Sequence, residues 1–178
     1  MNELHLLLAG FGGQGLLFAG KVIAYCGLIE GRQLSWLPSY GPEMRGGTAN
    51  CGVCVSDEPI GSPLVLAPKQ LIAMNKPSLA KFIDTVPSGG LVLIDSTMID
   101  DKISRPDVST FYVPSTGLAE EQGLKGLANI ILTGKLYAEY KFCKPETITA
   151  AIKKCVPAKR SEMVEANIKA FEIGKNYK

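Results

Sequence analysis

The sequence predicts a single-domain α/β fold in three layers, with a helical C-terminal part. An apolar run, 4–9, leads through a glycine turn into a longer apolar run, 16–29. Short strand-like runs alternate with turns as far as Val113, and helical spacing replaces them afterwards. With 178 residues, 46% of them hydrophobic, and 19 glycines, the chain has the composition of one α/β domain, 1–178, with a sizeable core.

The first part of the chain is expected to alternate strands and helices. Strands are predicted at 3–9, 33–37, 48–56 and 69–74, helices at 14–28 and 76–84, a loop at 38–47 and a Pro-rich connection at 57–68. A Pro-Ser-Gly-Gly turn at 87–90 precedes two short strands, 91–95 and 110–113. This order is typical of βαβ units.

The remaining chain is expected to be helical. A short helix is predicted at 115–122 and a long apolar helix at 127–140, and Pro145 is suited to the first position of the next one. Apolar residues recur at helical spacing in the last two helices: Ile148, Ile152 and Cys155, then Val164, Ile168 and Phe171. We expect both to be surface helices that pack through one stripe.

The hexapeptide Gly10-Phe11-Gly12-Gly13-Gln14-Gly15 is the first candidate site. Between a strand and a helix, Gly-x-Gly-x-x-Gly is typical of a Rossmann-like fold, in which a phosphate approaches the helix N-terminus. Dinucleotide enzymes carry an acidic residue about 20 residues on, at the end of the second strand. Glu30 instead precedes that strand, which ends in Trp36-Leu37-Pro38. Two interpretations stay open: a nucleotide site, and a turn that lets the helix pack closely on the sheet.

The second candidate site is the stretch Pro38-Ser39-Tyr40-Gly41-Pro42-Glu43-Met44-Arg45-Gly46-Gly47-Thr48. Adjacent glycines beside an arginine allow backbone N–H groups and a guanidinium to converge on a phosphate or carboxylate, and Tyr40 offers a stacking face. The alternative is a rigid loop in which Arg45 pairs with Glu43 or with a carboxylate of a partner subunit.

Patterns for catalysis or metal binding are scarce. His5 lies among leucines and is interpreted as structural, and Asp95 is expected to cap the turn that follows its strand. Cys51 and Cys54 match Cys-x-x-Cys, but residues three apart in a strand point to opposite faces and cannot share a metal. The five cysteines are interpreted as reduced, buried thiols. No catalytic and no metal-binding residue is predicted.

Charge and hydropathy limit the partners. A net charge of +2, without a long basic run, disfavours nucleic acid and membrane surfaces as partners. No secretory signal pattern begins the sequence, and the apolar run 16–29 is interrupted by Lys21 and too short to cross a bilayer. We expect a cytoplasmic chain whose partner is a protein or a small molecule.

The two motifs, in this order, resemble the gamma subunit of the 2-oxoacid:ferredoxin oxidoreductases, especially the separate gamma chain of the 2-oxoglutarate and branched-chain 2-oxoacid enzymes. Further residues continue the resemblance over nearly the whole chain: Ser56, Ile60, Ser62-Pro63, Asn129 with Gly134, and Asn167 with Gly174. The resemblance implies a non-catalytic, structural subunit that helps to enclose the coenzyme A (CoA) site.

The resemblance also implies the chemistry of the assembled enzyme. The enzyme oxidatively decarboxylates a 2-oxoacid such as 2-oxoglutarate to an acyl-CoA and CO2, and passes the electrons to ferredoxin. Thiamine diphosphate and Mg lie with the alpha and beta subunits, and iron–sulfur clusters in beta or a ferredoxin-like chain, so this chain alone binds no cofactor. Its partners are the alpha and beta subunits, with or without delta. The resemblance makes Arg45, with Tyr40, Gly46 and Gly47, candidates for a loop that faces CoA or the catalytic partner. The full set of predicted cofactor-binding residues is Gly10, Gly12, Gly13, Gln14, Gly15, Ser39, Tyr40, Glu43, Arg45, Gly46 and Gly47.

Two other functions stay open. A stand-alone NAD(P)- or flavin-dependent oxidoreductase would use the Gly10–Gly15 loop, and a pure scaffold would contact no small molecule. An isolated gamma chain is expected to be inactive and to form a homo-dimer or another oligomer through the 38–68 region and neighbouring helices, because apolar surface meant for partner subunits would be exposed.

Overall fold

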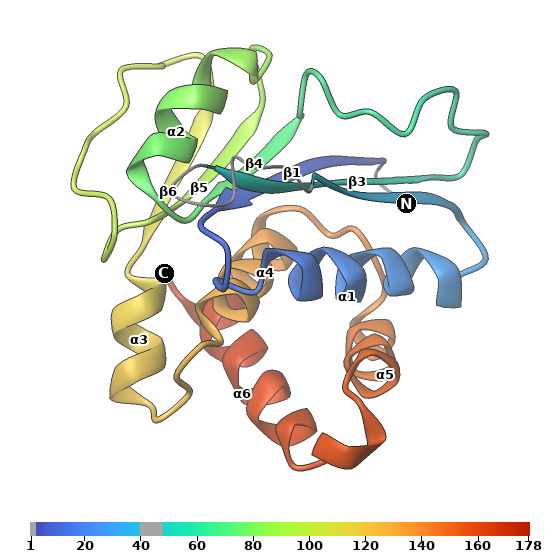
Figure 1. Cartoon of the computed structure of the whole chain (residues 1–178). Helices are drawn as coiled ribbons and strands as arrows, with labels where there is room; N and C mark the ends of the chain where they lie inside the picture. The colour runs from blue at the N-terminus through green and yellow to red at the C-terminus, as the bar shows by residue number, and fades with distance from the viewer. Residues whose placement is uncertain (1–2, 40–47) are drawn as a thin grey trace.

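The computed structural model describes residues 3–39 and 48–178, which form a mixed sheet of six strands with helices on both faces (Figure 1). The strands are β1 (Leu4–Gly10), β2 (Gln33–Ser39), β3 (Ala49–Ser56), β4 (Gln70–Ala73), β5 (Leu91–Asp95) and β6 (Ser109–Val113). Their order in the sheet is β2-β3-β1-β4-β5-β6. The predicted α/β fold is confirmed.

The strand β1 lies inside the sheet, between an antiparallel partner, β3, and a parallel one, β4. β5 and β6 continue the parallel part, whereas β2 adds antiparallel to β3. The carboxyl ends of β1, β4, β5 and β6 therefore meet at one edge, where open α/β sheets place ligands.

The second strand is longer than predicted. β2 continues two residues beyond 33–37, because Pro38 pairs with Cys51 and Ser39 with Asn50. A proline is tolerated there since β2 is an edge strand and has one side without a hydrogen-bonded neighbour. The rest of the predicted loop, 40–47, lies outside the described residues.

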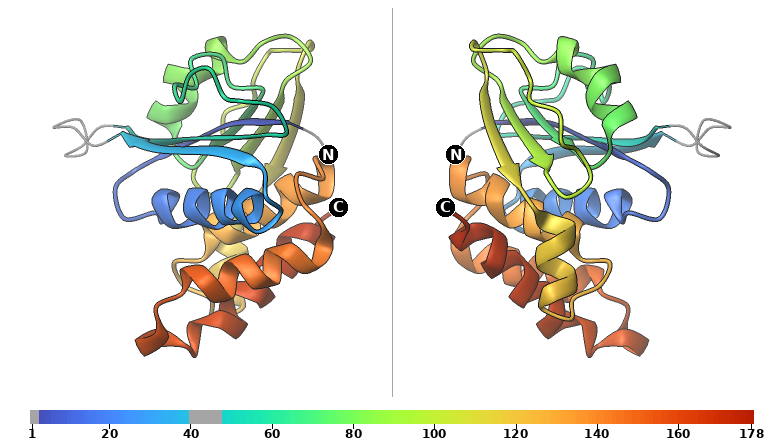
Figure 2. Two further views of the ribbon diagram at one scale, coloured as in Figure 1. Left: turned by 90° about the vertical axis from the view of Figure 1, so that its right-hand side faces the viewer. Right: turned by 90° about the vertical axis from the view of Figure 1, so that its left-hand side faces the viewer.

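Helices cover the two faces unequally (Figure 2). The helices are α1 (Leu16–Ile29), α2 (Lys76–Phe82), α3 (Ser115–Glu121), α4 (Ala128–Glu139), α5 (Pro145–Cys155) and α6 (Met163–Asn176), with short 3-10 turns η2 (Ile83–Thr85) and η3 (Ala158–Arg160). α2 packs on one face over a small apolar core, whereas α1, α4, α5 and α6 lie on the other over a larger one. No helix among the described residues is long and apolar enough to cross a membrane.

Local capping signals explain where two helices begin. Asn75 precedes α2 and accepts a hydrogen bond of 2.8 Å from the backbone N–H of Ser78, and Pro145 opens α5 as predicted.

Glu30, at the end of α1, forms hydrogen bonds to the first turn of α5. Its carboxylate accepts 2.7 Å hydrogen bonds from the backbone N–H of Lys144 and the hydroxyl of Thr147. Glu30 therefore joins α1 to α5 instead of standing at the end of β2.

The last helix packs through its predicted stripe and through residues outside it. Phe171 is buried, and Val164 and Ile168 are partly buried and pack against the larger core. Asn167 and Gly174, which the apolar spacing did not include, are also buried. At Gly174 the helix crosses α4 closely, because an added Cβ would overlap the backbone carbonyl of Ile131.

The five cysteines are free and buried, as predicted. Cys51 and Cys54 lie in β3, where side chains three residues apart project to opposite faces of the sheet. Cys51 belongs to the larger core beneath α1. The expected geometry of the Cys-x-x-Cys match is confirmed.

Candidate functional site

The β1–α1 loop is held in place by Gln14. Its side-chain oxygen accepts a 2.6 Å hydrogen bond from the backbone N–H of Phe11, and its side-chain nitrogen donates a 3.0 Å bond to the carbonyl of Met74, just beyond β4. A Cβ added at Gly10 would overlap the Gln14 side chain. The amide of Gln14 thus fastens the loop to the carboxyl edge of the sheet, and Gly10 leaves the space for it.

Two further glycines of the loop have left-handed backbone conformations. Gly13 has φ +93° and Gly15, which precedes α1, has φ +75°. Gly15 is also in close contact with Asn129 of α4: the Asn129 side chain donates a 2.8 Å hydrogen bond to the Gly15 carbonyl, and an added Cβ would lie 2.5 Å from its nitrogen. Turn geometry and close packing therefore explain these glycines without a ligand.

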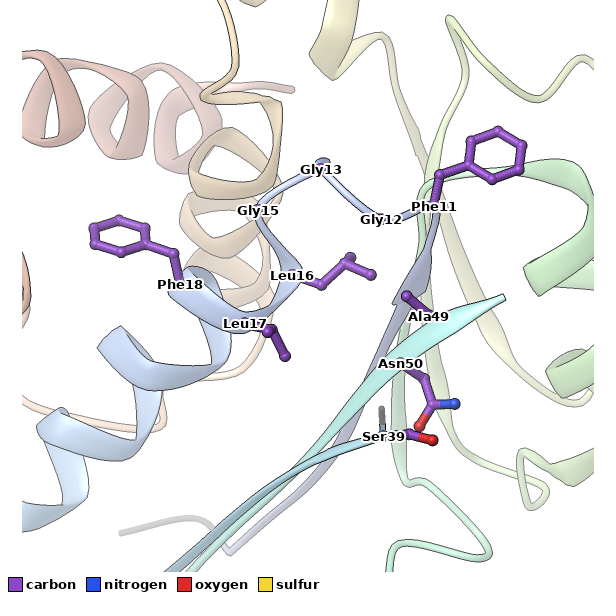
Figure 3. A pocket seen from close by; sticks show the side chains of 10 residues that line it. All are labelled: Phe11, Gly12, Gly13, Gly15, Leu16, Leu17, Phe18, Ser39, Ala49 and Asn50. Carbon is purple, nitrogen blue, oxygen red and sulfur yellow. The ribbon is translucent and has the colours of Figure 1, made fainter. Parts of the chain in front are cut away.

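A hollow of about 310 Å³ lies beside this loop (Figure 3). Its lining includes residues from the two candidate sites, namely Phe11, Gly12, Gly13, Gly15 and Ser39. Figure 3 shows Leu16 pointing from α1 toward the strands, while Ser39 and its strand partner Asn50 supply the polar side chains. Sequence reasoning missed Asn50, since a single polar residue in a predicted strand gives no signal of its own.

The described lining of this hollow carries no charged side chain. α1 begins with no side-chain cap and no acidic residue in its first turn, so its first backbone N–H groups and the helix dipole favour an anion there. Lys81 of α2 donates a 3.2 Å hydrogen bond to the Thr48 hydroxyl, which places an ammonium group next to the start of β3. Tyr40, Glu43, Arg45, Gly46 and Gly47, all predicted as site residues, lie outside the described residues.

Asp95 is fully buried at the end of β5 and is engaged within the fold. Its carboxylate accepts hydrogen bonds from the backbone N–H of Thr97 at 3.1 Å, and from the backbone N–H and hydroxyl of Thr116 at 3.3 and 2.6 Å. These bonds tie the turn after β5 to the start of α3. The prediction that Asp95 caps the next turn is confirmed.

Three of the buried thiols, those of Cys26, Cys51 and Cys155, are poor nucleophiles. Burial raises the pKa of Cys51 to about 12 and that of Cys155 to about 11. A hydrogen bond with Cys143, together with burial, raises the pKa of Cys26 well above its usual value. These thiols stay protonated near neutral pH, whereas the thiolate is the reactive form. Within residues 3–39 and 48–178, no group of three or more His, Cys, Asp or Glu side chains could hold a metal ion.

Comparison with known proteins decides the family. Residues 5–177 match the family described as pyruvate ferredoxin/flavodoxin oxidoreductase. This chain belongs to that family. It is 39% identical to the ketoisovalerate oxidoreductase subunit VorA of Methanothermobacter thermautotrophicus over 97% of its own length, but it spans only 36% of that longer protein.

Two other relatives match from end to end. The 2-oxoglutarate synthase subunit KorC of Methanocaldococcus jannaschii is 36% identical over 96% of this chain and 91% of its own length. The solved keto/oxoacid ferredoxin oxidoreductase gamma subunit from Geobacter sulfurreducens superposes with a TM-score of 0.83 at 28% identity, covering 96% of this chain and 95% of its own. The resemblance found in the two sequence motifs is confirmed.

Proposed function

We propose that this chain is the gamma subunit of a 2-oxoacid:ferredoxin oxidoreductase and acts within the assembled enzyme. The observation that carries the proposal is the end-to-end match to KorC, a separate subunit of a 2-oxoglutarate synthase, together with the match to a solved gamma subunit. The reaction is the oxidative decarboxylation of a 2-oxoacid such as 2-oxoglutarate to an acyl-CoA, with electrons passed to ferredoxin.

The proposal assigns the redox and decarboxylation chemistry to other subunits. Thiamine diphosphate, Mg and the iron–sulfur clusters would be held by the alpha and beta chains, with or without delta. The donor set of this chain supports that assignment, because its described residues offer no cluster of three or more metal ligands. Which 2-oxoacid is used would follow from the subunits that hold the thiamine.

This chain's own contribution would be to enclose CoA or a neighbouring subunit at the hollow beside α1. The uncapped N-terminus of α1, with Gly12, Gly13 and Gly15, provides backbone N–H groups for a phosphate or carboxylate. Ser39 ends β2 beside this hollow, and Arg45, six residues further along the sequence, would add a planar cationic group.

Reconstitution tests the assignment. The chain is co-expressed with alpha and beta subunits, and CoA-dependent reduction of ferredoxin by 2-oxoglutarate is measured with and without it. We expect a stable complex whose activity requires the chain, and an isolated chain that is colourless and inactive. Stoichiometric iron, retained nicotinamide or flavin, or turnover by the purified chain alone would contradict the proposal and favour a stand-alone oxidoreductase.

Arg45→Ala tests the role of the loop within that complex. Loss of a charge-assisted hydrogen bond of about 1.5–3 kcal/mol raises the KM for CoA, or weakens assembly, by roughly 10- to 150-fold. The KM for the 2-oxoacid is expected to change little. Arg45→Lys restores only part of the effect, because lysine keeps the charge but loses the planar fork. Unchanged CoA kinetics with unchanged assembly would assign the loop a purely structural role.

The isolated chain is proposed to self-associate through the surface that subunits would cover. Leu64 and Leu66 are 57% and 78% exposed in the connection after β3, and Trp36 and Leu37 of the edge strand β2 are 38% and 40% exposed. Light scattering at tens of micromolar should detect a homo-oligomer, since modest interfaces are occupied at about that concentration. A monodisperse monomer would contradict this expectation.

A further inference from the structure

A second pocket, of about 380 Å³, lies on the other side of the first turn of α1 and is not used by the proposed function. It is enclosed by α1, the connection between α5 and α6, and the first turns of α4 and α6. Figure 1 shows α1, α4, α5 and α6 together on this face of the sheet. Three groups of lining residues differ in chemistry: two buried amides, a set of apolar side chains and two exposed cations.

The two amides belong to Asn129 and Asn167, each 2% exposed. Asn129 donates its side-chain N–H to the Gly15 carbonyl at 2.8 Å, and Asn167 donates its own to the Met163 carbonyl at 2.7 Å. These bonds fix which side-chain atom is the nitrogen. Both oxygens are buried and have no hydrogen-bond partner among the described residues.

Two unpaired acceptors in one pocket call for a ligand that supplies N–H or O–H donors. An unpaired buried acceptor destabilises the fold, and native proteins keep few of them. Both of these line the same pocket. A single group with two donors, such as an amine, is therefore the simplest complement to them.

The remaining lining defines the other parts of the ligand. Phe18, Leu127 and Met163 supply apolar surface next to the amides, which suits a flat, weakly polar body. Lys159 and Arg160 line the pocket from η3 and are exposed, so they form its cationic mouth. The ligand would carry N–H donors at its inner end and an anion at its outer end.

We propose that this pocket binds an adenine nucleotide. The exocyclic amine of adenine has two N–H donors for the oxygens of Asn129 and Asn167, the planar base fills the apolar part, and the phosphates face Lys159 and Arg160. An α-amino acid fits less well, because its ammonium and carboxylate groups sit on one carbon and cannot reach both ends. Free nucleotides and CoA share this adenine and phosphate chemistry.

Calorimetric titration of the full chain with ADP and IDP tests the proposal. IDP keeps the phosphates and ribose, but its base carries a carbonyl oxygen where adenine carries the amine. We expect ADP to bind and IDP to bind at least about tenfold more weakly, because its oxygen would face two other oxygens. Competition by CoA would identify the co-substrate as the source of the adenine, and ADP binding without it would identify a free nucleotide.

Variants separate a binding role from a structural one. The pair Lys159→Ala and Arg160→Ala should weaken ADP binding at least about tenfold, since each cation contributes a charge-assisted contact. The matched control is the pair Lys153→Ala and Lys154→Ala, which removes two exposed cations in the last turn of α5 that do not line the pocket. The control should leave ADP affinity unchanged.

Asn167→Leu removes one unpaired oxygen together with the bond to Met163. We expect it to abolish the preference for ADP over IDP while Tm stays within a few degrees of the parent value. A lower Tm with unchanged ADP affinity would show that Asn167 is only structural. Equal binding of ADP and IDP, or no binding at millimolar concentration, would overturn the proposal and leave water as the partner of both oxygens. The experiment uses only this chain and free nucleotides, so its failure would not affect the proposed function.

Discussion

Gly13 of the β1–α1 loop and the two glycines of the α4–α6 crossing are in opposite surroundings. At Gly13 an added Cβ would meet nothing within 4 Å, and only its φ of +93° favours glycine. At Gly134 and Gly174 the backbone is ordinary helix, but a Cβ on either would overlap the backbone of the other helix. Gly13 is needed for its conformation, whereas the crossing glycines are needed for space, and packed backbone is the harder obstacle to move.

Gly174→Ala is expected to have the largest effect. Alanine favours a helix interior by about 1 kcal/mol over glycine, yet the new Cβ would overlap the Ile131 carbonyl and force α4 and α6 apart. We expect a net loss of more than about 3 kcal/mol in the free energy of unfolding, measured by urea titration. A loss below about 1 kcal/mol would mean that the two helices separate easily. Lack of space at the crossing would then not explain why it contains glycine.

Gly15→Ala should come second, because this position combines both requirements. The left-handed conformation costs a non-glycine residue about 1–2 kcal/mol, and the Asn129 contact adds to that. We expect a total loss of about 2–3 kcal/mol in the free energy of unfolding. In a double-mutant cycle with Asn129→Ala, part of the loss should disappear, since the contact is then gone. Strict additivity would show that the contact does not contribute.

Gln14→Leu removes the side chain that fastens the loop to the sheet. Without the Gln14 amide, the Phe11 N–H and the Met74 carbonyl lose their hydrogen-bond partner and must bind water instead. We expect a loss of about 1–2 kcal/mol in the free energy of unfolding. The control is Gln122→Leu, which replaces an exposed glutamine at the end of α3 and should change stability by less than about 0.5 kcal/mol. Equal effects of the two variants would show that the Gln14 side chain does not stabilise the loop.

Gly13→Ala is expected to have the smallest effect of the four. The left-handed conformation costs alanine about 1 kcal/mol. Part of this loss is offset, because alanine has less conformational entropy than glycine in the unfolded chain. Gly61→Ala is the matched control, since its Cβ also meets nothing within 4 Å and its φ is not left-handed. We expect the Gly13 variant to be less stable than the Gly61 variant by about 1 kcal/mol. A larger effect would indicate a contact at Gly13 that the described residues do not provide.

Much of the fold was predictable because its signals are local. The strand before the glycine loop, the helix after it and the proline that opens α5 each follow from neighbouring residues in the sequence. The capping role of Asp95 followed from its place at the end of a strand. The apolar spacing of α6 identified Phe171, which is buried, but not Gly174, because a glycine counts as no hydrophobic residue even where an added Cβ would overlap another helix.

The order of the elements, the two motifs and the family they indicate could all be predicted from the sequence, since each depends on residues close together along the chain. Which distant residues meet depends on the tertiary packing. Gln14 bonds to a carbonyl 60 residues away, and Glu30 and Asn129 reach partners 117 and 114 residues away. Asn129 and Asn167 come to line one pocket only because α4 and α6 cross. Such contacts depend on how helices pack on the sheet, which no local spacing encodes.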